Sequence, residues 1–234
     1  MYNKIDLEPR LDMITGLVPE CNIVCDIGTD HAYIPIRLIQ EEKCNKVIAT
    51  DINEGPIKTA LRNISEYGLE NRIEARVGNG LDCIEDDECD NILICGMGGL
   101  TITDILKQHP LKIEKCNRLI IQCMYANEMV REYCYKKGYD IQQELLCSDK
   151  GKLYTAMMII PNNHHKNFNP VNYYVSDAIF ENKDKDLIKR YITELIQRLH
   201  KVRFGHKKAK EPDVIRIDYI TDIINELIKI LDNI

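Results

Sequence analysis

Several kinds of residue and segment are scarce in this chain of 234 residues. It has no tryptophan and only three phenylalanines, which argues against the broad aromatic platforms on which some proteins stack single-stranded nucleic acid. No apolar run approaches the roughly 20 residues that a membrane helix needs. The opening segment, MYNKIDLEPR, lacks the apolar stretch of a secretory signal. The sequence therefore predicts a soluble, cytoplasmic protein with no membrane partner.

Metal and disulfide frameworks are also missing, although cysteine itself is plentiful. None of the 10 cysteines forms a C-x-x-C pair, and several lie within apolar runs, as Cys95 does in NILICGMGG. We interpret them as reduced, buried side chains in a reducing compartment. A metal pair at Cys21 and Cys25 is the alternative, but no matching His or Cys pair completes it, so no metal is expected.

Charge is unevenly distributed along the chain. Residues 1–161 carry 18 Lys and Arg against 26 Asp and Glu, a net −8, whereas residues 162–234 carry 13 against 11, a net +2. One run at 198–210, RLHKVRFGHKKAK, contains no acidic residue. Its cations are Arg198, Lys201, Arg203, Lys207, Lys208 and Lys210. Such a run is either a solvated helix end or a surface for an anionic partner.

The first 160 residues alternate between strand and helix patterns. Strands are predicted at 22–27, 47–52, 72–77, 91–95 and 118–123, and helices at 34–42, 56–68, 100–109 and 127–138. Two further strands, 139–147 and 152–160, are separated by four residues, too few for a crossover helix, so they form an antiparallel hairpin. The fold class is therefore α/β, a doubly wound Rossmann-like sheet with an antiparallel edge. That edge is typical of class I methyltransferases, whereas dinucleotide dehydrogenases usually end in parallel strands.

A second, helical unit is predicted after a linker. The segment PNNHHKNFNP at 161–170 has no periodicity, which divides the chain into domains of 1–161 and 162–234. Apolar residues then recur at heptad spacing in two series: Ile188, Ile192, Leu195, Leu199 and Val202, followed by Ile217, Ile220, Ile224, Leu227 and Leu231.

A chain reversal between the two series completes the helical unit. Gly205 and Pro212 interrupt the pattern within FGHKKAKEPD, so we predict an antiparallel coiled-coil hairpin with the basic run at its tip. Additional core is expected from Tyr173, Tyr174, Ile179 and Phe180. The two apolar series can pack against each other within one chain, which favours a monomer. Dimerisation through the hairpin is the alternative.

The carboxyl ends of the predicted strands, where α/β sheets bind ligands, carry candidate site residues. Gly28 permits a sharp turn and a close approach of a ligand to the backbone. Asp51, at the second strand end, can accept both hydroxyls of a ribose, and Asn79 can pair with an adenine edge. Gly96, Gly98 and Gly99 are expected to leave an open floor for a reacting centre. The alternative is that Asp26 and Asp51 only cap loops or helices.

The character of the first turn favours a cationic ligand over a phosphate. A complete G-x-G-x-x-G is absent, and Asp30 lies where a pyrophosphate would be repelled. S-adenosylmethionine carries a sulfonium, an α-ammonium and a carboxylate, and it has no phosphate. Asp26 and Asp30 are placed to face its positive groups.

Four segments together resemble one protein family. VCDIGTDHAYIP, ATDINEGP, GNGL and ICGMGG are similar to the bacterial tRNA (adenine-22-N1)-methyltransferases. The resemblance covers nearly the whole chain, from an L-x-x-R-L segment at Leu7 to Leu11 through to the helical hairpin. The chain departs from the family pattern at Asn79, where Asp is usual, and at Cys123-Met124, where Pro-Asn is common.

This resemblance implies methylation of N1 of adenine 22 in tRNA, with S-adenosylmethionine as the cofactor. The implied cofactor-binding residues are Asp26, Gly28, Asp51, Ile52, Asn79, Gly80, Gly96, Met97 and Gly98. The implied catalytic group is Asp30, His31, Tyr33 and Gln122. Structural roles are the alternatives for two of these: a hydrogen-bonding histidine in a turn at His31, and a packing ring at Tyr33. The basic run is the expected tRNA contact.

The acceptor chemistry needs no strong base. The N1 atom of adenine is neutral and has a lone pair, so the enzyme must position the base and stabilise a cationic product. Because N1 lies on the base-pairing edge, the adenine must be swung out of the tRNA structure. Candidate stacking partners are Tyr33, Met97 and Tyr125.

Two other function classes fit part of the sequence. A non-catalytic RNA-binding relative would keep the basic run but lose the cofactor groups, and Gly28, Asp51 and the GMGG segment are all present. A methyltransferase acting on a small molecule or a protein would keep those groups without needing the run at 198–210.

Overall fold

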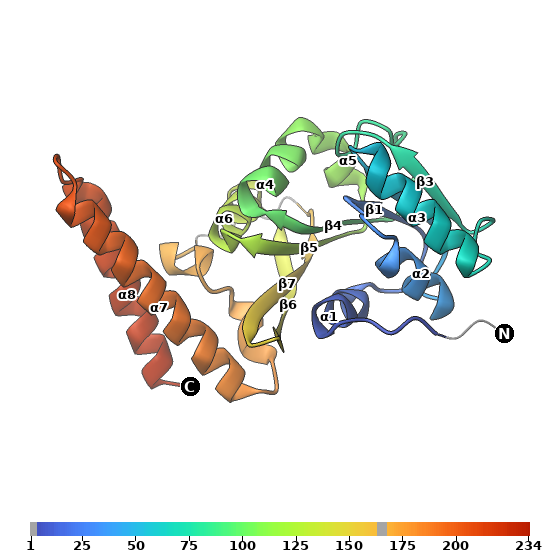
Figure 1. The fold of residues 1–234 in the computed structure, drawn as a ribbon. Helices are drawn as coiled ribbons and strands as arrows, with labels where there is room; N and C mark the ends of the chain where they lie inside the picture. Colours follow the sequence, from blue (N-terminus) through green and yellow to red (C-terminus); the bar gives the residue numbers. More distant parts are fainter. Residues whose placement is uncertain (1–3, 163–167) are drawn as a thin grey trace.

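The computed structural model describes residues 4–162 and 168–234 and is built on one mixed sheet (Figure 1). Its strands are β1 (Cys21–Ile27), β2 (Cys44–Asp51), β3 (Ile73–Val77), β4 (Asn91–Gly98), β5 (Arg118–Tyr125), β6 (Asp140–Asp149) and β7 (Lys152–Ile160). They lie in the order β3-β2-β1-β4-β5-β7-β6. The strands from β3 to β5 are parallel, and β7 is antiparallel to both β5 and β6. The predicted doubly wound sheet with an antiparallel edge is confirmed.

Helices cover both faces of this sheet. One layer comprises α1 (Pro9–Leu17), α2 (Tyr33–Gln40) and α3 (Glu54–Glu66), and the other comprises α4 (Gly99–Gln108), α5 (Pro110–Lys115) and α6 (Asn127–Lys137). Within β4, Ile92 and Ile94 pack into the core under α4 to α6, while Leu93 packs into the core on the opposite face. This two-sided burial explains why the strand is continuously apolar.

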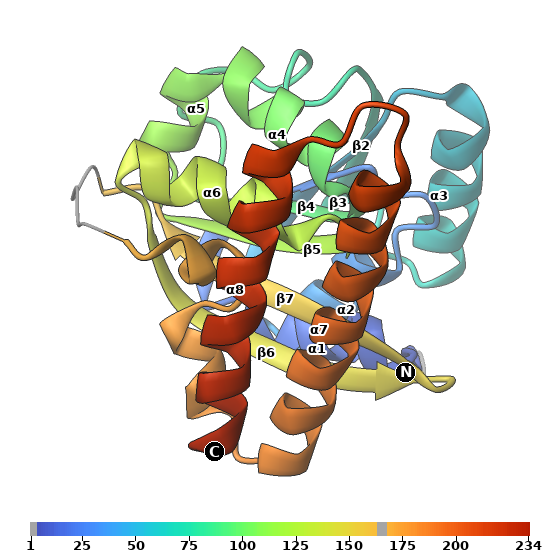
Figure 2. The same cartoon turned by 90° about the vertical axis from the view of Figure 1, so that its left-hand side faces the viewer.

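The C-terminal segment forms the predicted helical hairpin. After two short 3-10 helices, η1 (Pro170–Tyr173) and η2 (Asp177–Glu181), helices α7 (Lys185–Lys208) and α8 (Val214–Asp232) run in opposite directions beside the sheet (Figures 1 and 2). Their shared core includes Leu146 of β6, and the predicted contributions from Tyr173, Tyr174, Ile179 and Phe180 are confirmed. The hairpin is therefore packed onto the antiparallel edge of the sheet and not only onto itself.

Two details of the hairpin differ from prediction. Helix α7 continues through Gly205 to Lys208, so the chain reverses at 209–213 and not within FGHKKAKEPD as a whole. The seam opens near the tip, where Val202 is 41% exposed, while Ile223, outside the predicted seam, is buried. A glycine in a long helix costs only about 1 kcal/mol relative to alanine, which packing along the rest of α7 offsets.

Half of the predicted linker at 161–170, residues 163–167, lies outside the described residues, so the division into domains at 161 and 162 stays a prediction. Within the described residues, no helix combines the length and the hydrophobicity of a membrane span.

Candidate active site

Two adjoining hollows lie at the carboxyl ends of β1, β2 and β4. Their volumes are about 480 and 320 Å³, and both are lined by Gly28, Asp51 and Met97. The larger one is also lined by Asp26, Asp30, His31, Tyr33 and Gly96, and the smaller one by Ile52, Asn79 and Gly80. The structure thus gathers most of the predicted site residues around one bent cleft at the topological switch point of the sheet.

The turn after β1 depends on Gly28. Its φ is +81°, and its N–H donates to the carbonyl of Thr50 over 2.8 Å. A Cβ at this position would lie 2.2 Å from Cε of Met97, whose side chain crosses between the two hollows. The positive φ favours glycine, and the absence of a side chain leaves room for the end of Met97.

Asp51 lies at the junction of the two hollows. One carboxylate oxygen accepts the N–H of Asn53 over 2.8 Å, so the side chain also fixes the turn into α3. Asp51 therefore does cap this loop, as the alternative interpretation expected, and it also lines both hollows. A carboxylate held in this way is pre-oriented for hydroxyl donors.

Asp26 is a buried acid in the larger hollow. Asp26 is only 3% exposed, and this burial raises the pKa of its carboxyl group to about 6. Desolvation disfavours the ionised carboxylate, and a cationic ligand group restores it. This acid therefore favours a ligand that carries positive charge.

Asp30, His31 and Tyr33 form the rim of the larger hollow. Asp30 and Ala32 both have positive φ, 52° and 59°, which shows a tight turn before α2. His31 Nε2 lies 3.3 Å from Asp30 Oδ2, and its ring stacks on Tyr33 with centroids 5.2 Å apart. The His31 carbonyl accepts a hydrogen bond from Asn63. The three predicted catalytic side chains are adjacent and exposed to solvent, where a large substrate can reach them.

Gln122 has a different setting from the other predicted catalytic residues. It is 0% exposed, and its side-chain oxygen accepts from the Arg10 guanidinium over 2.9 Å and from the Gly96 N–H over 3.2 Å. Its side-chain NH₂ donates to the carbonyl of Cys123 over 2.6 Å. The amide is fully engaged, so this geometry does not support a direct contact with a base. It shows that Gln122 ties the end of β4 to Arg10.

Arg10 is a site residue to which the sequence analysis assigned no role. It is the only Lys or Arg lining the larger hollow within the described residues, and its guanidinium also lies 5.7 Å from the Tyr154 ring centroid. Glu8, on the same rim, is paired with Lys150. The signal in the sequence was the arginine of the L-x-x-R-L segment, whose place in the site depends on a contact with a strand 112 positions away.

The glycines after β4 only partly form the open floor that was expected. A Cβ at Gly96 would meet nothing within 4 Å. At Gly98 it would lie 2.4 Å from Tyr125 Cζ, and at Gly99 it would lie 2.1 Å from the carbonyl oxygen of Ala126. The prediction of an open floor at Gly98 and Gly99 is wrong, because these two glycines let the end of β4 pack closely against the end of β5.

The basic run divides into cations with partners and exposed cations. Arg198 pairs with Glu128 of α6 over 3.0 Å, and Arg203 donates to Thr221 of α8 over 3.2 Å. Lys208 lies 4.6 Å from the Phe204 ring centroid, near the end of α7. Lys201, Lys207 and Lys210 are exposed. Arg198 and Arg203 thus help to hold the hairpin in place.

All 10 cysteines are free thiols. Across 4–162 and 168–234, no group of three or more His, Cys, Asp or Glu side chains is arranged to hold a metal ion.

Comparisons with known proteins show the family of this chain. A family described as methyltransferase domain matches residues 7–157. The tRNA (adenine(22)-N(1))-methyltransferase of Bacillus subtilis strain 168 is 35% identical over 156 residues, which are 67% of this chain and 66% of that protein. The structure of M. capricolum TrmK in complex with S-adenosyl-homocysteine is 30% identical and covers 97% of this chain and 98% of that one, with a TM-score of 0.80. The chain belongs to the TrmK family.

The likeness to the TrmK family includes the helical hairpin. The crystal structure of B. subtilis TrmK is 26% identical and covers 95% of this chain and 99% of that one, with a TM-score of 0.82. The curated sequence match to the B. subtilis protein spans just under two thirds of that protein's length. The structural likeness therefore extends beyond the segment in which the sequences match most clearly.

Proposed function

We propose that this TrmK-family chain transfers a methyl group from S-adenosylmethionine to N1 of adenine 22 in tRNA. The observation that carries the proposal is the bent cleft, which combines Asp26, Asp51 and Asp30 with a single arginine, Arg10. A ligand with two positive groups, a carboxylate and a ribose matches this set, whereas a dinucleotide phosphate does not.

Each part of the methyl donor has a complementary residue. Asp51 accepts the ribose hydroxyls, and Asn79 in the smaller hollow binds the adenine edge. Asp26 faces the ammonium group, and Arg10 pairs with the carboxylate. The bound donor supplies an electrophilic methyl group, and the chain's residues orient it toward the opening at Gly96.

Gln122 acts as a positioning residue. Its side-chain oxygen holds both the Arg10 guanidinium and the Gly96 N–H. It therefore fixes the distance between the group that holds the donor's carboxylate and the opening at Gly96.

The rim residues receive the target base. Tyr33 presents a ring stacked on His31, and Met124 lines the same hollow. Transfer places positive charge on the adenine ring, and the Asp30 carboxylate, 3.3 Å from His31 Nε2, is placed to offset it. Because N1 attacks through its own lone pair, no residue has to remove a proton before transfer.

The hairpin supplies the contact with the tRNA backbone. Lys201, Lys207 and Lys210 are exposed on a run without acids, and phosphate contacts of this kind give affinity without reading sequence. We infer a monomer, because the buried seams of α7 and α8 pack against each other within one chain. We place the enzyme in the cytoplasm, a reducing compartment in which free thiols such as its 10 cysteines persist.

A substrate panel tests the proposal. The protein and radiolabelled S-adenosylmethionine are incubated with one substrate at a time. The four substrates are unmodified tRNA, the same tRNA carrying guanine at position 22, free adenosine, and a mixed protein extract. We expect label only in the first tRNA. Label in adenosine or in protein, with none in tRNA, would contradict the proposed substrate class.

A further inference from the structure

A second cleft lies between α6, η1 and α8, outside the hollows that hold the methyl donor. Its volume is about 640 Å³, within the roughly 300–1,000 Å³ of typical small-ligand sites. It is lined by Ala126, Glu128, Met129, Glu132, Lys136, Tyr173, Tyr174, Arg216 and Tyr219. Ala126 directly follows the exposed Tyr125 at the end of β5, and Met124 lines the larger hollow. The cleft therefore begins at the edge of the sheet where the methyl group is transferred.

The cleft has one cation without an acidic partner. Glu128 is paired with Arg198 over 3.0 Å, and Glu132 with Lys136 over 2.6 Å. Arg216 lies over the Tyr219 ring, 5.2 Å from its centroid, and forms no ion pair with any described carboxylate. The two acids in the lining are thus neutralised by neighbours, and the remaining charge of the cleft is positive.

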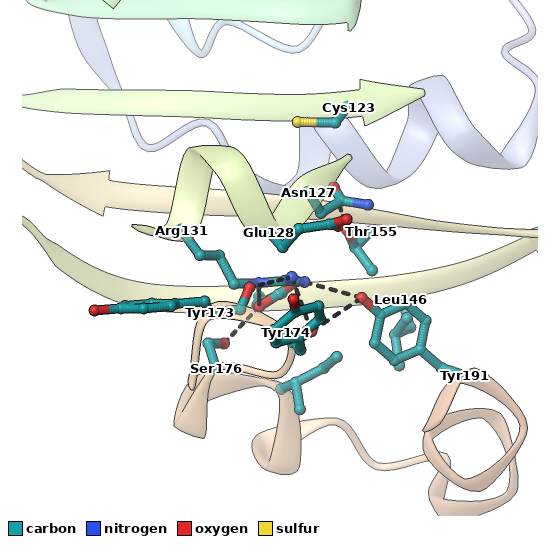
Figure 3. Close-up of polar contacts among 12 residues, drawn as sticks. Cys123, Asn127, Glu128, Arg131, Leu146, Thr155, Tyr173, Tyr174, Ser176 and Tyr191 are labelled. Carbon is teal, nitrogen blue, oxygen red and sulfur yellow. Dashed lines mark hydrogen bonds and ion pairs between the residues drawn. The ribbon is translucent and has the colours of Figure 1, made fainter. Parts of the chain in front are cut away.

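A buried ion pair holds the aromatic wall of the cleft. Arg131 of α6 and Glu144 of β6 are paired and each is 1% exposed. Arg131 also donates to the carbonyls of Tyr173 and Tyr174 over 3.3 and 2.9 Å (Figure 3). Burying a charged pair costs desolvation energy unless further hydrogen bonds complete it. The carbonyls of Tyr173, at the end of η1, and of Tyr174, its C-cap, provide those bonds, so the backbone that presents both tyrosines has a fixed position.

The same ion pair connects the hairpin to α6. Arg131 donates to the hydroxyl of Tyr191 on α7 over 3.0 Å, and the Ser176 hydroxyl donates to Glu144 (Figure 3). The Arg198–Glu128 pair is a second link between α7 and the start of α6. These links hold α7 against α6, and α8, which carries Arg216 and Tyr219, packs on α7, so the two sides of the cleft are connected through α7.

We propose that this cleft binds a nucleotide of the tRNA that adjoins the methylated adenine, a step that rests on the proposed function. Swinging the adenine out of the tRNA unstacks its neighbours, and an unstacked base needs a new surface for its face. Tyr219 and Tyr173 supply aromatic faces, and the guanidinium of Arg216 supplies the partner for the adjoining phosphate. An unpaired arginine beside tyrosines fits a nucleotide better than it fits an apolar or a cationic partner.

The salt dependence of tRNA binding tests the role of Arg216. Arg216→Gln is compared with Lys229→Gln, a change of the same charge on the same helix outside the cleft lining. We expect Arg216→Gln to weaken binding of an unmodified tRNA transcript several-fold at low salt and to flatten the log–log salt slope by about one unit. Affinity for S-adenosylmethionine stays at the parent value in both variants, and Lys229→Gln leaves the salt slope unchanged.

A photo-crosslink locates the bound nucleotide. Met129 lines the cleft and is 37% exposed, so a benzoylphenylalanine in its place leaves the core intact. We expect it to crosslink to the nucleotides that adjoin the target adenine. A crosslink confined to a distant part of the tRNA overturns the assignment.

The two proposals fail in different ways. If the parent protein methylates tRNA and Arg216→Gln matches it in affinity, salt slope and KM, then the cleft is not a nucleotide site and the proposed function stands. If the parent protein does not methylate any tRNA, the proposed function is wrong and the nucleotide site is wrong with it.

Discussion

At the scale of single residues, the proposed function makes donor binding depend most directly on Asp51. Each charge-assisted hydrogen bond contributes roughly 1.5–3 kcal/mol, and about 1.4 kcal/mol changes affinity tenfold. We expect Asp51→Ala to weaken S-adenosylmethionine binding at least tenfold, measured by calorimetry. The control is Asp86→Ala, an exposed loop acid away from both hollows. Unchanged affinity in a folded Asp51→Ala protein removes this residue from the site.

Asp26 gives the donor site a pH dependence. Burial raises the pKa of Asp26 to about 6, whereas an unfolded chain has an aspartate pKa of about 3.9. Between about pH 4 and 6 the unfolded state loses this proton first, so the contribution of Asp26 to the free energy of unfolding is present below pH 4 and is lost as the pH rises. Affinity for S-adenosylmethionine changes in the opposite direction, because the donor's cations favour the ionised carboxylate.

A comparison of Asp26→Asn with the parent protein separates the effect of Asp26 ionisation from that of other titrating groups. We expect parent affinity for S-adenosylmethionine to fall as the pH drops below about 6, and the variant to bind weakly with little of that pH dependence. Denaturation of both proteins from pH 4 to 7 gives the stability change. Identical pH profiles for the two proteins would show that Asp26 does not titrate in this range.

The sequence alone predicts the position of residues that lie at the end of a single strand. Asp26 and Asp51 lie at the carboxyl ends of β1 and β2, and Asn79 lies two residues after β3, so a correct strand pattern puts them in the cleft. Arg10 and Gln122 are harder, because their roles come from a contact between a terminal helix and a strand far along the chain. Periodicity within a segment carries no information about such a contact.

At the scale of elements, the packing between the carboxyl ends of β4 and β5 is sensitive to side-chain size. A side chain at Gly98 would displace the Tyr125 ring, which is 65% exposed and can move aside. We therefore expect Gly98→Val to fold and to bind S-adenosylmethionine, but to lose most of its turnover, because the strand ends beside the target base are rearranged. Gly55→Ala, with nothing within 4 Å of the added Cβ, is the matched control. Normal methylation by Gly98→Val would place the target base elsewhere.

The elements themselves were predicted with small errors at their ends. Alternation and turn residues locate all seven strands, and the short connection before β7 correctly predicts its antiparallel pairing. Helix α5 was missed because its six residues are too few to show a period. The extension of α7 through Gly205 was missed because packing on the rest of the helix outweighs one unfavourable residue.

At the scale of the whole molecule, net charge differs between the two parts of the chain, −8 for residues 1–161 and +2 for residues 162–234. Under the proposed function, the acidic part holds the donor, and the lysines at the hairpin tip contact the tRNA. Replacement of Lys207, Lys208 and Lys210 by alanine should weaken tRNA binding at low salt, with each lost phosphate contact flattening the log–log slope by about one unit or less. Donor affinity should not change.

Titration of tRNA at several salt concentrations measures this effect. The control replaces Lys58, Lys115 and Lys229, three exposed lysines outside the hairpin tip. If the tip variant and the parent have the same tRNA affinity and the same salt slope, the lysines only keep the loop between α7 and α8 solvent-exposed. The tRNA-binding surface then lies on the catalytic part.

The most direct measurement is the identity and position of the methylated nucleoside. Unmodified tRNA is incubated with the protein and S-adenosylmethionine, digested, and analysed by mass spectrometry, with primer extension to locate the modified position. We predict 1-methyladenosine at position 22, because in the proposed function the donor's methyl group lies beside the rim that receives the adenine, and N1 attacks through its own lone pair. A methyl group on another atom or another nucleotide, or none on tRNA, contradicts it.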